Sequence, residues 1–236
     1  ACRMASARRF LYLVDPSLLR RGLFHGQRVA DYLSSHLGNH TFDDVRIPVY
    51  LVAVDLNSRQ QVILCQGRVV DAVRATIAIP GIFPPVERGD QLLVDGGVLN
   101  NLPADVARTM NADVVIAVDV HSGPGDGPFA KMGGRRYVPN GAAQTLDFLW
   151  QSFNLMLAEI QRLRLVQAPP DIFIHPAIPA DITTLAGFPR AAEILAAGEQ
   201  AAQEALPEIW ACVQPTHIPS GAASGALLGQ NEQRRT

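Results

Sequence analysis

The sequence predicts an α/β fold, because strand-like apolar runs alternate along the chain with segments of helical periodicity. Three runs carry this prediction, at residues 48–55, 92–95 and 113–120. The first and third are apolar on both faces, which is typical of interior strands of a parallel sheet. We therefore expect these three strands to lie in one largely parallel sheet that is flanked by helices.

Local signals before the second strand predict a helix and a hairpin. Residues 27–37 carry an apolar side chain at every fourth position, and Gly38 follows where the helix should end. The strand at 48–55 continues through a polar turn into a second apolar run at 62–65, which indicates a hairpin.

The second strand is expected between two helices. Apolar residues at positions 70, 73 and 77 predict a helix that ends before Pro80, because the residue before a proline avoids helical geometry. Beyond the strand, Asn101 is expected to cap a new helix that has Pro103 in its first turn. Asn111 stands where a left-handed residue would end that helix.

The last third of the chain predicts two further helices and a short strand. The glycine- and proline-rich residues 121–141 indicate a loop, and residues 145–167 have apolar side chains three and four apart. We favour a helix buried along the core there; the alternative is an apolar wall for acyl chains or a surface that touches lipid. A short strand is expected at 171–176, and an alanine-rich helix at 189–206 that ends near Pro207.

A carboxylate followed by two glycines is the strongest candidate for a functional site. Asp95 directly follows the predicted strand 92–95, and Gly96 and Gly97 come next. In open α/β sheets ligands bind at the carboxyl ends of strands, and glycines let the backbone turn sharply and be approached closely. The alternative is an ordinary Asp-Gly turn that closes a strand.

The words around this carboxylate resemble a known family. RATIAIPGIFPPV at residues 74–86, LVDGGVLNNLPADVAR at 93–108 and NADVVIAVDV at 111–120 are similar to the second half of bacterial patatin-like phospholipases. The resemblance covers about residues 15–210. It implies a three-layer sandwich with a mostly parallel sheet, no cofactor, and a Ser–Asp dyad that acts on lipid esters without a catalytic histidine. The family's catalytic aspartate matches Asp95, in the motif Asp95-Gly96-Gly97.

The family's Gly-x-Ser-x-Gly nucleophile elbow does not occur in this sequence. Residues 221–225, GAASG, have the serine one place late and lack the flanking strand and helix that an elbow needs. We therefore interpret the chain as an N-terminally incomplete patatin-like domain at 15–212, with a linker remnant at 1–14 and a disordered tail at 213–236. Without the family's nucleophile strand, the runs 50–54 and 114–118 are expected to have unpaired edges.

Two function classes follow from the resemblance. The first is a patatin-like lipid acyl hydrolase of which this chain holds the aspartate half, so that it is inactive alone. The second is a non-catalytic lipid-binding or protein-interaction member that keeps the fold without the nucleophile. In both cases the expected partner is a lipid ester or phospholipid, with peripheral membrane contact; the lipid headgroup and the oligomeric state stay open.

Composition argues against other classes of protein. The net charge is −2 and Lys131 is the one lysine, whereas nucleic-acid binding needs clustered cations. Cys2, Cys65 and Cys212 are odd in number and lack zinc-ligand spacing, which favours a reducing compartment such as the cytoplasm. A signal peptide before Ala1 would reverse that expectation.

Other titratable residues are alternatives to Asp95 as site residues. Asp55 and Asp119 also end predicted strands, and Asp119 could join His121 in a Ser-His-Asp arrangement. His36 and His40 have the spacing of metal ligands on one helix, but Gly38 interrupts that helix, so no metal site is predicted.

Overall fold

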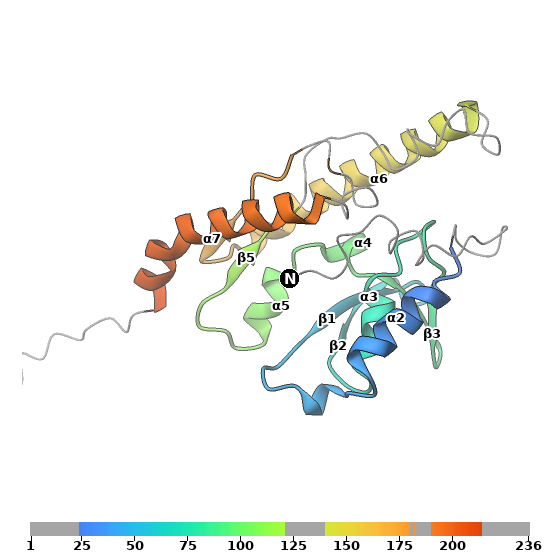
Figure 1. Cartoon of the computed structure of the whole chain (residues 1–236), viewed down its shortest axis with the longest axis horizontal. Coiled ribbons are helices and arrows are strands. Elements are labelled where there is room, and N and C mark those ends of the chain that lie inside the picture. Colours follow the sequence, from blue (N-terminus) through green and yellow to red (C-terminus); the bar gives the residue numbers. More distant parts are fainter. Residues whose placement is uncertain (1–23, 121–139, 180–181, 183–189, 214–236) are drawn as a thin grey trace, which may run out of the picture.

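The computed structural model describes residues 24–120, 140–179, 182 and 190–213, arranged as two small sheets and the helices around them (Figure 1). The strands are β1 (Leu51–Asp55), β2 (Gln60–Leu64), β3 (Val86–Arg88), β4 (Gln91–Asp95), β5 (Ile116–Val118) and β6 (Ile172–Ile174). The helices are α2 (Gln27–Leu37), α3 (Val69–Thr76), α4 (Gly97–Asn100), α5 (Ala104–Thr109), α6 (Asn140–Gln167) and α7 (Ala191–Val213), with a 3-10 turn at Phe42–Asp44.

The α/β class is confirmed, but the prediction of one largely parallel sheet is wrong. The first sheet has the order β2-β1-β4-β3, and every pair in it is antiparallel. The strand predicted at 113–120 is shorter, forms β5, and pairs in parallel with β6 in a second sheet. Apolar residues on both faces of a strand report burial, and burial does not distinguish parallel from antiparallel neighbours.

Strand β1 is interior to its sheet, so the expected unpaired edge at 50–54 is wrong. Val54 pairs with Gln61 of β2 on one side and with Val94 of β4 on the other. Strand β5 behaves as expected at 114–118: among the described residues it pairs with β6 alone, and Ile116 and Val118 stay 42% and 47% exposed. Among the described strands, the open edge therefore lies in the second sheet.

Local signals placed the first helices and turns correctly. Helix α2 covers the predicted residues 27–37, and Gly38 after it has a positive φ of 57°. Helix α3 ends before Pro80, and Asn111 has the expected left-handed φ of 60°. The predicted hairpin is the antiparallel pair β1–β2.

The core of the first sheet is small and consists of side chains from β1, β2, β4, α3 and the 3-10 turn. Its members are Phe42, Ala53, Leu64, Ala72, Ala75 and Leu93. Ala53 and Leu93, on neighbouring strands, are completely buried. Helix α3 packs on β1 and β4 from this side, while α4 contacts β1 and α6 (Figure 1).

Helix α6 is only partly buried, against the favoured interpretation of its sequence. It crosses above α4, and its N-terminal turns extend beyond the first sheet (Figure 1). Phe153 and Ile160 are half-buried, but one side of the helix is exposed over its length. This side, which we name the α6 stripe, consists of Phe148, Leu149, Leu155, Met156, Leu163 and Val166.

Helix α7 continues past the point where the sequence predicts its end. Pro207 lies inside the helix, which runs to Val213. Proline removes one backbone donor and disturbs the preceding turn, and the final turns of α7 run at an angle to the rest (Figure 1). The predictions for residues 1–14, for most of the loop 121–141 and for residues 214–236 lie outside the described residues.

The chain passes from β4 into α4 at a point of close backbone contact. A Cβ on Gly96 would lie 2.3 Å from the carbonyl oxygen of Val52 in β1. The Thr76 hydroxyl donates a hydrogen bond to the same oxygen at 2.5 Å. Any side chain at position 96 would therefore push β1 and β4 apart.

Substitution Gly96→Ala is expected to destabilise the fold by about 1–3 kcal/mol, the usual cost of overpacking. The matched control is Gly198→Ala on α7, where a Cβ would meet no atom within 4 Å. That control should be neutral or raise the free energy of unfolding by up to ~1 kcal/mol, because alanine favours helix. Urea unfolding of both variants measures the difference, and equal stabilities would contradict the contact.

Candidate functional site

Asp95 is the last residue of β4, directly before the turn into α4. Its backbone pairs with Ala53 of β1, and its N–H donates to the carbonyl oxygen of Ala78 at 3.1 Å. The side chain curls toward the following turn, where the N–H of Gly97 donates to Asp95 Oδ1 at 2.7 Å. The carboxylate is thus fixed at the end of an interior strand by its own turn.

The electrostatic environment of Asp95 favours its protonated form. Burial raises the pKa of the carboxyl above its usual value, and the hydrogen bond from Gly97 partly opposes that shift. A carboxylate with a raised pKa is a stronger base than an exposed one, which suits proton transfer near neutral pH.

Asp55 shows the opposite environment at the end of the neighbouring strand. Its carboxylate accepts hydrogen bonds from the Ser58 hydroxyl and from the N–H groups of Leu92, Asn57 and Ser58. These bonds, the Ser58 hydroxyl first, lower the pKa of Asp55 to about 2. Its acceptor sites are occupied by the hairpin turn and by β4, so we assign it a structural role.

Asn101 does not cap the helix that the sequence predicts after it. Helix α5 begins at Ala104 with Pro103 before it, and Asn101 ends the short α4, which the sequence did not reveal. The Asn101 Nδ2 group donates to Gln161 Oε1 on α6 at 3.1 Å. This local capping signal was overridden by a tertiary contact with a residue far along the chain.

A buried polar cluster joins the same turn to α5 and α6. Asn100 is 2% exposed, and its Nδ2 group donates to Gln61 Oε1 and to Asp105 Oδ1, each at 2.8 Å. Arg164 Nη1 donates to Asp105 Oδ2 at 2.8 Å. Sequence reasoning missed this cluster, because Gln61 and Arg164 are tens of residues away from Asn100 and Asp105 and the four residues lack a common motif.

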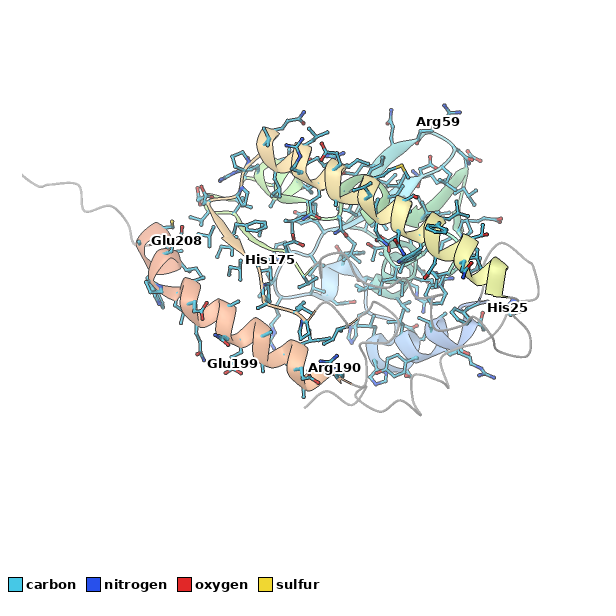
Figure 2. The ribbon with its side chains drawn as sticks, turned by 90° about the horizontal axis from the view of Figure 1, so that it is seen from above. His25, Arg59, His175, Arg190, Glu199 and Glu208 are labelled. Atoms are coloured by element: carbon cyan, nitrogen blue, oxygen red, sulfur yellow. The ribbon has the colours of Figure 1, made fainter. Side chains whose placement is uncertain are left out.

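The structure gives Asp119 a different histidine from the one considered in the sequence. Asp119 Oδ2 lies 3.7 Å from His175 Nδ1 and accepts a hydrogen bond from Gln161 Nε2 at 2.8 Å. His175 follows β6, beside α7 (Figure 2), and His121 lies outside the described residues. The pairing of β5 with β6 brings Asp119 and His175 together, since both residues follow parallel strands.

The remaining candidates form no site in the part of the chain that the structure describes. His36 and His40 are separated by the end of α2, and no group of three His, Cys, Asp or Glu side chains is arranged to hold a metal ion there. Cys65 and Cys212 are free thiols. None of the described helices combines the length and hydropathy of a membrane span.

Comparison with known proteins relates part of the chain, which includes Asp95, to one family. Residues 3–108 match the patatin-like phospholipase family. An uncharacterized NTE family protein of Mycobacterium tuberculosis is 40% identical over 121 residues, which are 50% of this chain and 21% of that protein. A second one from the same organism is 34% identical over 145 residues, covering 61% and 39% of the two chains.

A mammalian relative matches a shorter stretch. The patatin-like phospholipase domain-containing protein 7 of Rattus norvegicus is 35% identical over 102 residues, or 42% of this chain and 8% of the relative. The chain thus spans well under half the length of the curated relatives it matches. Residues 3–108 and these relatives thus identify part of a patatin-like phospholipase domain in this chain.

Proposed function

We propose that Asp95 is the carboxylate of a Ser–Asp dyad in a lipid acyl hydrolase of the patatin type. The observation that carries the proposal is the geometry of Asp95, a carboxylate with a raised pKa at the end of β4, held by the N–H of Gly97. The serine of such a dyad would stand in a Gly-x-Ser-x-Gly elbow, a motif that these 236 residues do not contain.

In the reaction we propose, the serine hydroxyl attacks the ester carbonyl of the lipid while Asp95 accepts its proton. Asp95 passes this proton to the alcohol that leaves as the acyl-enzyme forms. In the second step Asp95 takes a proton from the attacking water and returns it to the serine oxygen as the fatty acid is released. A lowered pKa like that of Asp55 would make the carboxylate a poorer base. Burial of Asp95 therefore supports the assignment of the base.

We also propose that the α6 stripe contacts the lipid surface from which the substrate is taken. Helix α6 packs on α4, the helix that begins at Gly97, so the stripe lies on the helix that covers the candidate site. The exposed Glu159–Arg162 ion pair lies between the apolar residues of this stripe, so the stripe is amphipathic, as in helices that bind in the interfacial region of a bilayer. The free thiols of Cys65 and Cys212 support a reducing compartment such as the cytoplasm.

The dyad is tested in the protein extended to include its serine elbow. Substitution Asp95→Asn should lower turnover of a short-chain nitrophenyl ester by about 10²–10⁴-fold, the usual contribution of a positioned general base. Asp90→Asn, at an exposed aspartate in the turn between β3 and β4, is the matched control and should leave the rate unchanged.

The following outcomes test the role of Asp95 and distinguish the two function classes. Equal rates for the wild type and Asp95→Asn would remove Asp95 from the mechanism. The 236-residue chain itself is expected to give only background turnover and no labelling by a fluorophosphonate probe. A non-catalytic lipid-binding role would be favoured if the extended protein also stayed unlabelled.

The α6 stripe predicts binding to uncharged phospholipid. The double substitution Leu155→Gln and Met156→Gln removes two exposed apolar side chains and should weaken cosedimentation with phosphatidylcholine vesicles at least ~10-fold, since each buried side chain contributes about 1.5–3 kcal/mol. Leu195→Gln, at a 60% exposed leucine of α7, is the control. An equal loss of vesicle binding by the α6 double variant and by Leu195→Gln would contradict a specific role for α6.

The raised pKa of Asp95 implies a cost in stability. At pH values between the usual carboxyl pKa and the raised pKa of Asp95, the folded protein binds more protons than the unfolded chain. The free energy of unfolding therefore falls as the pH rises through this window. Asp95→Asn keeps an oxygen for the N–H of Gly97 and removes the charge. Its Tm should exceed that of the wild type at neutral pH, and the difference should shrink as pH falls below the window; a lower Tm at neutral pH would be inconsistent with this account.

A further inference from the structure

We propose that Gln161 is a positioning residue for the turn that carries Asp95, and that it acts through Asn101. The inference rests on the proposed function for its catalytic meaning, but the contacts that carry it are independent of that function. Gln161 lies on α6, is 9% exposed, and uses both ends of its amide in hydrogen bonds to other elements.

The orientation of the Gln161 amide follows from its partners. Its Nε2 group lies 2.8 Å from Asp119 Oδ2, and an ionised carboxylate only accepts hydrogen bonds, so the nitrogen must face Asp119. The oxygen then faces Asn101 and accepts from its Nδ2 group at 3.1 Å. Asp119 therefore determines which end of Gln161 is presented to Asn101.

The orientation of the Asn101 amide determines which of its atoms lies beside Gly97 in the turn. With its nitrogen directed at Gln161, its Oδ1 atom faces Gly97, and a Cβ on Gly97 would lie 3.0 Å from that atom and 3.0 Å from Asp95 Oδ1. The Asn101 amide and the Asp95 carboxylate thus flank the same backbone position. Because the N–H of Gly97 is the donor to Asp95, a shift of Asn101 would disturb that hydrogen bond.

A second polar contact also holds α6 in place, so Gln161 can be substituted without loss of the packing of α6. Arg164, three residues further along α6, binds Asp105, which also accepts from Asn100. This route bypasses Asn101. A variant that loses Gln161 is therefore expected to remain folded, with α6 still held on α4 and α5.

The signal that reports on the turn is the Gly97 amide, observed by NMR during a pH titration of the 236-residue chain. His175, Asp119, Asp105 and Arg164 carry the other ionisable groups around this network, so the part of the Gly97 signal that belongs to Asp95 must be identified separately. Asp95→Asn supplies that baseline: the part of the titration that disappears in this variant belongs to Asp95.

Substitution Gln161→Leu should shift the midpoint of the Asp95 titration downward and reduce its amplitude. The reason is that a loosened turn admits water to a carboxylate whose pKa is raised by burial. Gln151→Leu, the same substitution at an exposed position of α6, should reproduce the wild-type curve. A folded Gln161→Leu protein with the wild-type midpoint and amplitude would overturn the proposal.

A charge exchange tests the route through Asp119. Gln161→Glu alone places two carboxylates together and should perturb the Gly97 signal. Combining it with Asp119→Asn places an amide donor at position 119 opposite the carboxylate at position 161. The double variant keeps an oxygen at position 161 to face Asn101, and its net charge equals that of the wild type. In the double variant, the Gly97 titration should return toward that of the wild type. If the effects of the two single substitutions simply add, the proposed pairing of Gln161 with Asp119 is refuted.

The catalytic consequence is measured separately in the protein that contains the serine elbow. There Gln161→Leu should lower kcat several-fold and leave KM unchanged, because the substrate contacts are untouched. If Asp95→Asn is also without effect on kcat, the proposed function fails while the positioning result from NMR stands. If Asp95→Asn abolishes turnover and Gln161→Leu leaves kcat unchanged, the positioning role is refuted.

Discussion

The close approach of Gly96 to the Val52 carbonyl is the constraint on which the candidate site depends. It lets β4 end directly against β1, so that Asp95 still pairs with Ala53 while the next residue already turns into α4. The turn then folds the N–H of Gly97 back onto the carboxylate. A side chain at position 96 would separate the two strands and move the carboxylate away from its donor. The first glycine therefore serves packing, and the second supplies the hydrogen bond.

Two strand-ending carboxylates, Asp55 and Asp95, illustrate how surroundings decide function. Both end neighbouring antiparallel strands. Asp55 accepts several hydrogen bonds, so its charge is stabilised and its pKa falls to about 2. Asp95 is desolvated with less compensation, so its pKa rises. The first carboxylate holds a hairpin, whereas the raised pKa of the second fits the role of proton acceptor that we propose for it.

Helix α6 has two different roles on its two sides. Gln161 and Arg164 face inward and bind the polar residues that follow β4. The α6 stripe faces outward, and its apolar side chains have no cover among the described residues. A helix that contacts both a lipid surface and the turn of Asp95 would link substrate binding to the geometry of the site, which is consistent with the family's lipid chemistry.

The sequence by itself determined the α/β class, the helix at residues 27–37, the left-handed Asn111 and Asp95 as the candidate carboxylate, because these depend on local periodicity, local backbone preferences and a short motif. Strand direction required the tertiary structure, since apolar runs record burial and not the orientation of neighbours. The cap predicted at Asn101 was wrong, and the histidine beside Asp119 is not the one considered as an alternative, for the same kind of reason. Gln161 and His175 are distant in the chain, and only the crossing of α6 and the pairing of β5 with β6 bring them to these residues.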